Sequence, residues 1–156
     1  MMTRFSVSVY WLFYLLIGAS VHLSCEPQDP SGEIVPVPVD FEITLSRPDF
    51  LPLRTVGGAM IYRGNTSNAL GVRGFILYRA SDREIIVYDR NCSYQPEMTC
   101  STVELGPNNQ FIHDPACCGS VFRLSDGSPL NGPARRPLYR YLTSQDGDIF
   151  RIYNEL

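Results

Sequence analysis

The sequence predicts an all-β domain, and three observations support this fold class. Several short segments alternate apolar and polar residues with a period of two, as half-buried strands do. Turn signals rich in Gly and Asp separate these segments at short intervals. No segment after Cys25 sustains a helical period. Short strands joined by such turns are typical of an antiparallel sandwich or small barrel.

Each expected strand is defined by its own pattern. The first alternates strictly, and the second follows the pair Gly57-Gly58. The turn at residues 80–83 joins the third and fourth strands into a hairpin, and Asp146-Gly147 pairs the last two. The expected strands cover residues 39–45, 59–63, 74–79, 84–89, 111–113, 120–124, 138–142 and 148–153.

The N-terminus has the features of an export signal. A short start with Arg4 precedes an almost wholly apolar run over residues 7–18, and small residues follow. The apolar run is too short to be a typical membrane-spanning helix. We therefore expect residues 1–24 to be a signal peptide and the mature protein to be exported.

The end of this signal resembles the processing box of bacterial lipoproteins, in which a peptidase cuts just before a Cys that becomes lipidated. Cys25 is the expected lipidation site, although His22 stands where the family prefers Leu. The resemblance implies a protein anchored to a membrane in the periplasm or at the cell surface. Residues 25–40, rich in Pro and acids, are expected to form a tether. Residues 41–156 then form one β domain.

Composition excludes one large class of partner. The chain of 156 residues carries a formal net charge of −3, so the attraction to phosphate that drives nucleic-acid binding is missing. No glycine loop for phosphate, nucleophile elbow or paired carboxylates stands out. Nothing in the sequence indicates hydrolytic or transferase activity.

Four cysteines in the domain mark the candidate site. Cys92 and Cys100 share one loop, Cys117 and Cys118 share another, and each loop follows a strand. An even number of cysteines in an exported protein favours disulfides, which could pair in three ways. Thiolates also bind iron–sulfur clusters and zinc, so these four residues are candidate metal ligands. Their spacing matches structural zinc sites poorly.

The order of these segments resembles that of the Rieske iron–sulfur domain over roughly residues 53–154. The resemblance starts at the glycine pair before the second strand, continues through a strand that runs into Cys92, and ends at the last hairpin. The most specific pieces are Cys118-Gly119-Ser120-Val121-Phe122, Gly132-Pro133-Ala134 and Pro137-Leu138.

The resemblance also implies where a cluster would bind. In the Rieske family each loop supplies one Cys and one His, so that two thiolates hold one iron and two imidazoles hold the other. Here Cys92 keeps the first position, but Tyr94 and Cys118 stand where the two His belong, and Pro115 where the second Cys belongs. A two-His site is excluded, because His113 is the one histidine beyond the predicted signal. We expect His113 to be structural.

Two functions follow from the resemblance. The first is an electron-transfer module with an atypical [2Fe–2S] site, in which Cys92 and Cys118 are ligands and Cys100, Cys117 or Tyr94 completes the set. The second is a cluster-less Rieske-fold lipoprotein whose loops are tied by disulfides and which serves as a binding or structural module. Some Rieske domains carry one inter-loop bridge, and Cys117 holds the position of its second-loop Cys. The implied partners are the membrane and a redox or other protein at the loop tips.

Overall fold

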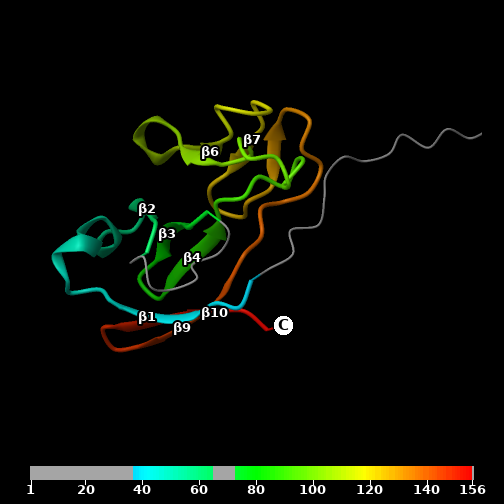
Figure 1. The fold of residues 1–156 in the computed structure, drawn as a ribbon. Helices are drawn as coiled ribbons and strands as arrows, with labels where there is room; N and C mark the ends of the chain where they lie inside the picture. The colour runs from blue at the N-terminus through cyan, green and yellow to red at the C-terminus, as the bar shows by residue number, and fades with distance from the viewer. Residues whose placement is uncertain (1–36, 65–72, 156) are drawn as a thin grey trace, which may run out of the picture.

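The computed structural model describes residues 37–64 and 73–155, and over these residues the chain folds into three antiparallel sheets (Figure 1). Ten short strands and two short 3-10 helices make up the regular structure of the described residues. The predicted all-β class is confirmed. The predicted signal peptide at residues 1–24 and the lipidation site Cys25 lie outside the described residues, as does most of the tether.

The first sheet joins the two ends of the domain. Its strand order is β1 (Asp40–Thr44), β10 (Ile149–Tyr153) and β9 (Leu142–Asp146). β9 and β10 form a hairpin in which Gly147 adopts a positive φ of 58°, a conformation that favours glycine. The Arg151 guanidinium donates two hydrogen bonds to the Asp40 carboxylate across the β1–β10 pair. The start and the end of the domain are therefore held side by side.

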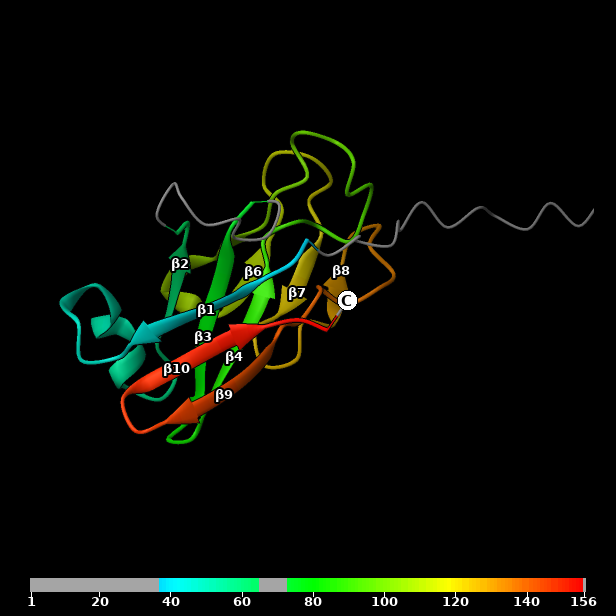
Figure 2. The same ribbon diagram turned by 60° about the horizontal axis from the view of Figure 1, so that its bottom comes forward.

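The second sheet lies in the middle of the molecule, between the other two (Figures 1 and 2). It contains β2 (Ala59–Tyr62), β3 (Phe75–Ser81) and β4 (Glu84–Asp89), paired in that order. Side chains of β3 and β4 alternate between two cores: Phe75 and Leu77 enter the first, and Ile76 enters the second. This two-sided burial explains why β3 and β4 read as nearly continuous apolar runs.

The third sheet carries the second cysteine-bearing loop. It contains β5 (Glu104–Leu105), β6 (Phe111–His113), β7 (Val121–Arg123) and β8 (Pro129–Asn131), in sequence order. A 3-10 helix, η2 (Pro107–Asn109), connects β5 to β6, and a longer one, η1 (Pro48–Arg54), follows β1. The sequence did not predict β5 or β8, because β5 has only two residues and β8 begins with a proline, so neither shows an alternating apolar pattern.

Two hydrophobic cores fill the spaces between the sheets. The first lies between the outer sheet β1-β10-β9 and the middle sheet, and includes Phe75, Tyr141 and Phe150. The second lies between the middle sheet and β5–β8, and includes Ile76, Tyr88, Phe122 and the thiol of Cys92. One candidate site residue is therefore part of a core rather than of the surface.

The prediction of a strand at residues 138–142 is wrong. Residues 138–141 form no strand of that hairpin and run antiparallel beside β4, where Tyr88 and Arg140 form an isolated bridge and the N–H of Tyr141 donates to the Val87 carbonyl at 2.9 Å. The strand β9 begins at Leu142, because the tight turn at Gly147 fixes its pairing with β10. The pattern at residues 138–142 is misleading because Leu138 and Tyr141 are buried in different cores and do not lie on one face of a single strand.

A buried Tyr–Asp pair joins residues 138–141 to the end of β4. The Tyr141 hydroxyl donates a 2.6 Å hydrogen bond to Oδ2 of Asp89, and both residues are almost fully buried. The other oxygen of Asp89 accepts the N–H of Asn91 at 2.7 Å, at the start of the loop that carries Cys92. The pair therefore helps to fix the point at which β4 ends and the cysteine-bearing loop begins.

We predict that Tyr141→Phe lowers the free energy of unfolding by about 1–3 kcal/mol, because a buried carboxylate loses a hydrogen bond. Tyr139→Phe is the matched control, since the Tyr139 hydroxyl makes no hydrogen bond to a described residue and its ring packs edge-on against that of Tyr141, 5.0 Å between centroids. The control should change the free energy by less than about 0.5 kcal/mol. Urea unfolding of the three proteins measures both effects, and equal losses would contradict the role of the pair.

Alkaline pH should destabilise the fold through the same tyrosine. Burial and the nearby Asp89 carboxylate raise the pKa of Tyr141 above its usual value, and burial likewise raises the pKa of Tyr88. Above about pH 10 the unfolded chain loses tyrosine protons that the folded chain keeps, so the free energy of unfolding falls as pH rises. In urea unfolding, the difference in free energy of unfolding between wild type and Tyr141→Phe should become smaller as the pH rises from about 8 to about 11. A difference in free energy that stays constant over this pH range would contradict a raised pKa for Tyr141.

Candidate functional site

The first cysteine loop, residues 90–103, connects β4 to β5 and is closed at its base by a buried arginine. Arg90 donates from Nε to the Val103 carbonyl at 3.1 Å and accepts the N–H of Val103 at 2.8 Å. Within the loop, the N–H of Cys92 donates to the Ser101 carbonyl at 3.1 Å. The backbone on either side of Cys92 is therefore fixed by hydrogen bonds across the loop.

A second arginine holds the outer part of the first cysteine loop. Nη1 of Arg73 donates to the Thr99 carbonyl and the Thr102 hydroxyl, both at 2.8 Å. Nη2 donates to the carbonyls of Met98 at 2.5 Å and Pro96 at 3.4 Å. A planar guanidinium suits this arrangement, because it presents several donors in fixed directions. Arg73, just before β3, thus shapes the loop that carries Cys100.

The second cysteine loop, residues 114–120, connects β6 to β7 in a tight turn built around Asp114. The backbone of Asp114 exchanges hydrogen bonds with Ser120 and Gly119 at 2.9 and 3.0 Å. Its Oδ1 accepts the N–H groups of Ala116 and Cys117 at 3.2 and 2.9 Å. An Asp that accepts backbone N–H groups two and three residues later is a usual way to stabilise a turn.

The two cysteine loops are joined covalently. Cys100 and Cys117 form a disulfide with a Cα–Cα distance of 5.2 Å, within the normal range. Figure 2 shows both loops projecting together from one end of the molecule. This bond is one of the pairs that the sequence left open, and it removes these two cysteines from the set of free thiols.

The other two cysteines lie close to each other, and the carboxylate of Asp114 lies beside them. The Sγ atoms of Cys92 and Cys118 lie 3.7 Å apart, and Sγ of Cys118 lies 3.4 Å from Oδ2 of Asp114. One atom from each residue falls within 4.8 Å of the others, and we call these three residues the thiol–carboxylate group. Cys92 and Asp114 have no exposed surface, whereas Cys118 is partly exposed.

Further polar contacts fix the position of Cys118. Its Sγ lies 3.1 Å from the Ser120 hydroxyl and 3.4 Å from the Ser120 nitrogen, and that hydroxyl accepts the N–H of Ala134 at 3.1 Å. The backbone at Gly132 approaches closely as well, since a Cβ there would lie 2.6 Å from Cα of Ser120. The glycine that precedes Pro133-Ala134 therefore lets the chain pack against the second cysteine loop.

Burial controls the ionisation of the inner thiol. Loss of solvation raises the pKa of Cys92 to about 12, which a backbone hydrogen bond opposes and the nearby Cys118 reinforces. Cys92 is therefore a neutral thiol at neutral pH in the metal-free protein. A cation bound beside it would favour the thiolate that metal binding requires.

The structure separates the predicted site residues into two pairs. Cys92 and Cys118 come together, while Cys100 and Cys117 are bonded to each other. Tyr94 is half-buried and packs against the same core as Cys92. His113 lies on β6, where its ring packs edge-on against Phe111 at 5.5 Å, and it is not part of the thiol–carboxylate group.

Sequence reasoning missed two residues of this site, Asp114 and Ser120. The sequence pattern does not single out Asp114, because an acid in a turn usually serves only to stabilise that turn. One signal in the sequence could have indicated Asp114: it directly precedes Pro115 and lies four residues before Cys118. An Asp at such a position can stabilise a turn with one carboxylate oxygen and direct the other toward the cysteine.

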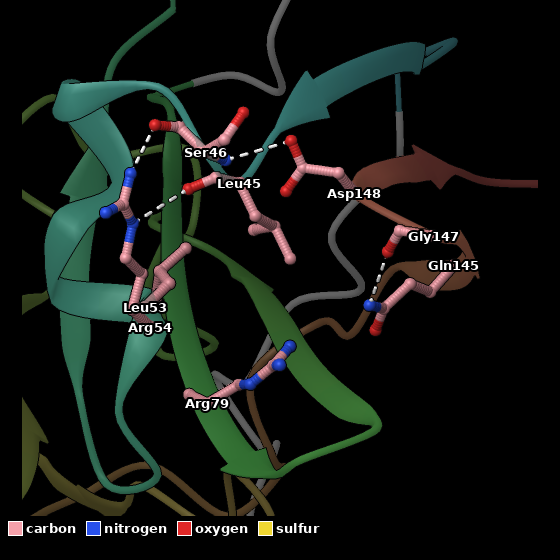
Figure 3. Close-up of a pocket in the computed structure, with 8 residues that line it drawn as sticks. All are labelled: Leu45, Ser46, Leu53, Arg54, Arg79, Gln145, Gly147 and Asp148. Carbon is pink, nitrogen blue, oxygen red and sulfur yellow. Dashed lines mark hydrogen bonds between the residues drawn. The ribbon is translucent and has the colours of Figure 1, made fainter.

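A pocket of about 380 Å³ lies among η1, the end of β1 and the β9–β10 hairpin (Figure 3). Its charged groups mostly hold these segments together: Arg54 donates to the carbonyls of Leu45 and Ser46, and Asp148 accepts the N–H of Ser46. Arg79 donates from Nη2 to the Asp82 carbonyl, and its buried Nη1 has no partner among the described residues. The pocket lining contains no thiol or imidazole, so it has no group comparable to the thiol–carboxylate group.

Comparison with known proteins finds similar solved structures but no matching sequence family. No family model matches the chain, and no curated protein matches it. Three chains of solved structures match, and one belongs to a complex of reduced oxygenase and oxidised ferredoxin in carbazole 1,9a-dioxygenase. It is 18% identical, the alignment covers 64% of this chain and 82% of that chain, and the TM-score is 0.42. At this level of similarity, the function has to be argued from the site itself.

We predict that Arg73→Lys loosens the first cysteine loop while the sheets stay intact, because one ammonium cannot contact four acceptors at once. Amide exchange at Met98 and Ser101 should become about tenfold faster, with no change in β3. Arg83→Lys is the matched control, because the Arg83 side chain makes no hydrogen bond or ion pair with a described residue. Unchanged exchange at Met98 and Ser101 would contradict the role of Arg73.

Proposed function

We infer that this chain is a Rieske-like electron-transfer module with an atypical [2Fe–2S] centre at the thiol–carboxylate group. One observation carries the proposal: thiols from two loops converge beside a buried carboxylate, with the sulfur atoms 3.7 Å apart. Two loops held against each other at one end of an all-β domain is the arrangement that the resemblance to the Rieske domain implies.

The residues present fit an iron–sulfur centre in ligand type and spacing. Cysteine thiolates are the usual ligands of such clusters. Two thiolates on one four-coordinate metal, at bond lengths of about 2.3 Å, lie about 3.8 Å apart. The distance between Cys92 and Cys118 agrees with that value. Asp114 supplies a third donor, and Tyr94 is the remaining candidate for a fourth, since Cys100 and Cys117 are bonded to each other.

Each residue has a distinct role in this proposal. Cys92 and Cys118 would hold the group, which when bound supplies one-electron transfer. Asp114 orders the second cysteine loop through Oδ1 and presents Oδ2 to Cys118. The Cys100–Cys117 disulfide limits how far the loops can separate. Met98, exposed on the first cysteine loop, offers an apolar contact for a redox protein partner.

A second candidate function has its own supporting observation. The two loops are already tied by a disulfide, so the fold does not require a cluster to keep them together. In this case the chain is a cluster-less Rieske-like scaffold that binds a protein partner through its loop tips.

We also propose that the protein is exported and anchored to a membrane through Cys25. An intramolecular disulfide is typical of exported proteins, which supports the proposal. No helix within residues 37–64 and 73–155 is long and apolar enough to cross a membrane.

Measurement of iron and acid-labile sulfide, after anaerobic purification of the chain, tests the proposed centre. We expect about two of each per chain and loss of most of both in Cys118→Ser, because a serine hydroxyl is a poor ligand for iron–sulfur clusters. His113→Gln is the matched control and should keep both, since His113 lies outside the thiol–carboxylate group. Absence of both elements would overturn the proposal in favour of the scaffold, and iron without sulfide would contradict a cluster.

A further inference from the structure

The free thiols of Cys92 and Cys118 are placed so that they can bond to each other. They lie on different loops, 26 residues apart in sequence, and their sulfur atoms are 3.7 Å apart. A disulfide bond is about 2.05 Å long, so closure requires an approach of about 1.7 Å. Side-chain rotation can supply a movement of this size within loops that are already joined by Cys100–Cys117.

The two thiols differ in how easily a reagent can reach them. Cys118 is partly exposed, whereas Cys92 has no exposed surface and packs in the second core. A dissolved disulfide can therefore contact Cys118 directly. Cys92 can react in the folded protein through the sulfur of Cys118, its near neighbour.

Hydrogen bonds hold the outer thiol in place for this reaction. The N–H of Ser120 donates to Sγ of Cys118, and the Cys118 thiol donates to Oδ2 of Asp114. The other oxygen of Asp114 and the hydroxyl of Ser120 accept backbone N–H groups, so these partners are themselves fixed. Such a supporting arrangement keeps the sulfur of Cys118 directed toward Cys92.

We propose that the metal-free protein carries out thiol–disulfide exchange with small or protein disulfides, with Cys118 as the attacking thiol and Cys92 as the resolving thiol. In the first step the sulfur of Cys118 bonds to one sulfur of a disulfide RS–SR, and RSH leaves with the proton. In the second step the sulfur of Cys92 bonds to that of Cys118 and releases the second RSH. Two protein thiols are thereby oxidised, and one disulfide is reduced to two thiols.

This activity goes beyond the proposed iron centre, because it concerns the chain without metal. The oxidised product would carry a second bridge between the same two loops, beside Cys100–Cys117. Reduction of that bridge would return the two thiols to the thiol–carboxylate group. The disulfide exchange thereby decides whether these sulfur atoms are free to bind a metal.

Glutathione disulfide is a suitable probe for the chain after metal removal with a chelator and gentle reduction. We expect wild type to lose two titratable thiols and release two glutathione thiols per chain, about 100-fold faster than after Cys118→Ser, whose remaining thiol is exposed only by local opening. Peptide mapping should then find Cys92 joined to Cys118. Pairing of Cys92 with Cys100 or Cys117 would overturn the proposal.

The variant Cys92→Ser separates the two steps. It should stop at the first step and carry one glutathione per chain on Cys118, visible by intact mass. A folded Cys92→Ser chain that takes up no glutathione would overturn the role of Cys118, as would wild type that keeps a stable mixed disulfide. Circular dichroism checks that each variant is folded, and the mapping on wild type does not depend on the variants. Because all these samples lack metal, failure here leaves the iron measurement unaffected.

Discussion

Burial of the middle sheet on both faces is the constraint on which the rest of the structure depends. β3 and β4 place alternate side chains in two separate cores. Each core is complete only when a second sheet covers that face of the middle sheet. The outer sheet β1-β10-β9 closes the first core, and β5–β8 closes the second. Since Cys92 follows β4 directly and packs in the second core, the position of the inner thiol is set by the packing of the domain.

The candidate site uses a different kind of stabilisation from the cores. Cys92 and Val103 pack in the second core, but the rest of the two loops is fixed mainly by hydrogen bonds that Arg73 and Arg90 donate and Asp114 accepts, and by the disulfide Cys100–Cys117. Hydrogen bonds and covalent bonds specify geometry more closely than apolar contact does. The site is thus a rigid frame around two thiols, which suits either metal binding or exchange chemistry.

The proposed iron centre and the proposed exchange activity place different demands on the same sulfur atoms. Metal binding needs both thiols deprotonated and reduced, and exchange needs Cys118 reachable by another disulfide. Burial of Cys92 opposes its ionisation, and Asp114 adds a further negative charge nearby. Cys92 therefore stays a neutral thiol in the metal-free protein until a cation or an oxidant reaches it.

The sequence by itself determined the all-β class, most strand positions and the two cysteine-bearing loops, because alternation and turn residues act over a few neighbouring positions. It did not determine the strand pairing of residues 138–142, whose apolar side chains face two different cores. It also did not determine the very short strands β5 and β8. The pairing of Cys100 with Cys117, and the meeting of Cys92, Cys118 and Asp114, were decided by the tertiary structure alone. These contacts join residues on separate loops, and the distance between such residues depends on how the sheets that carry the loops pack together.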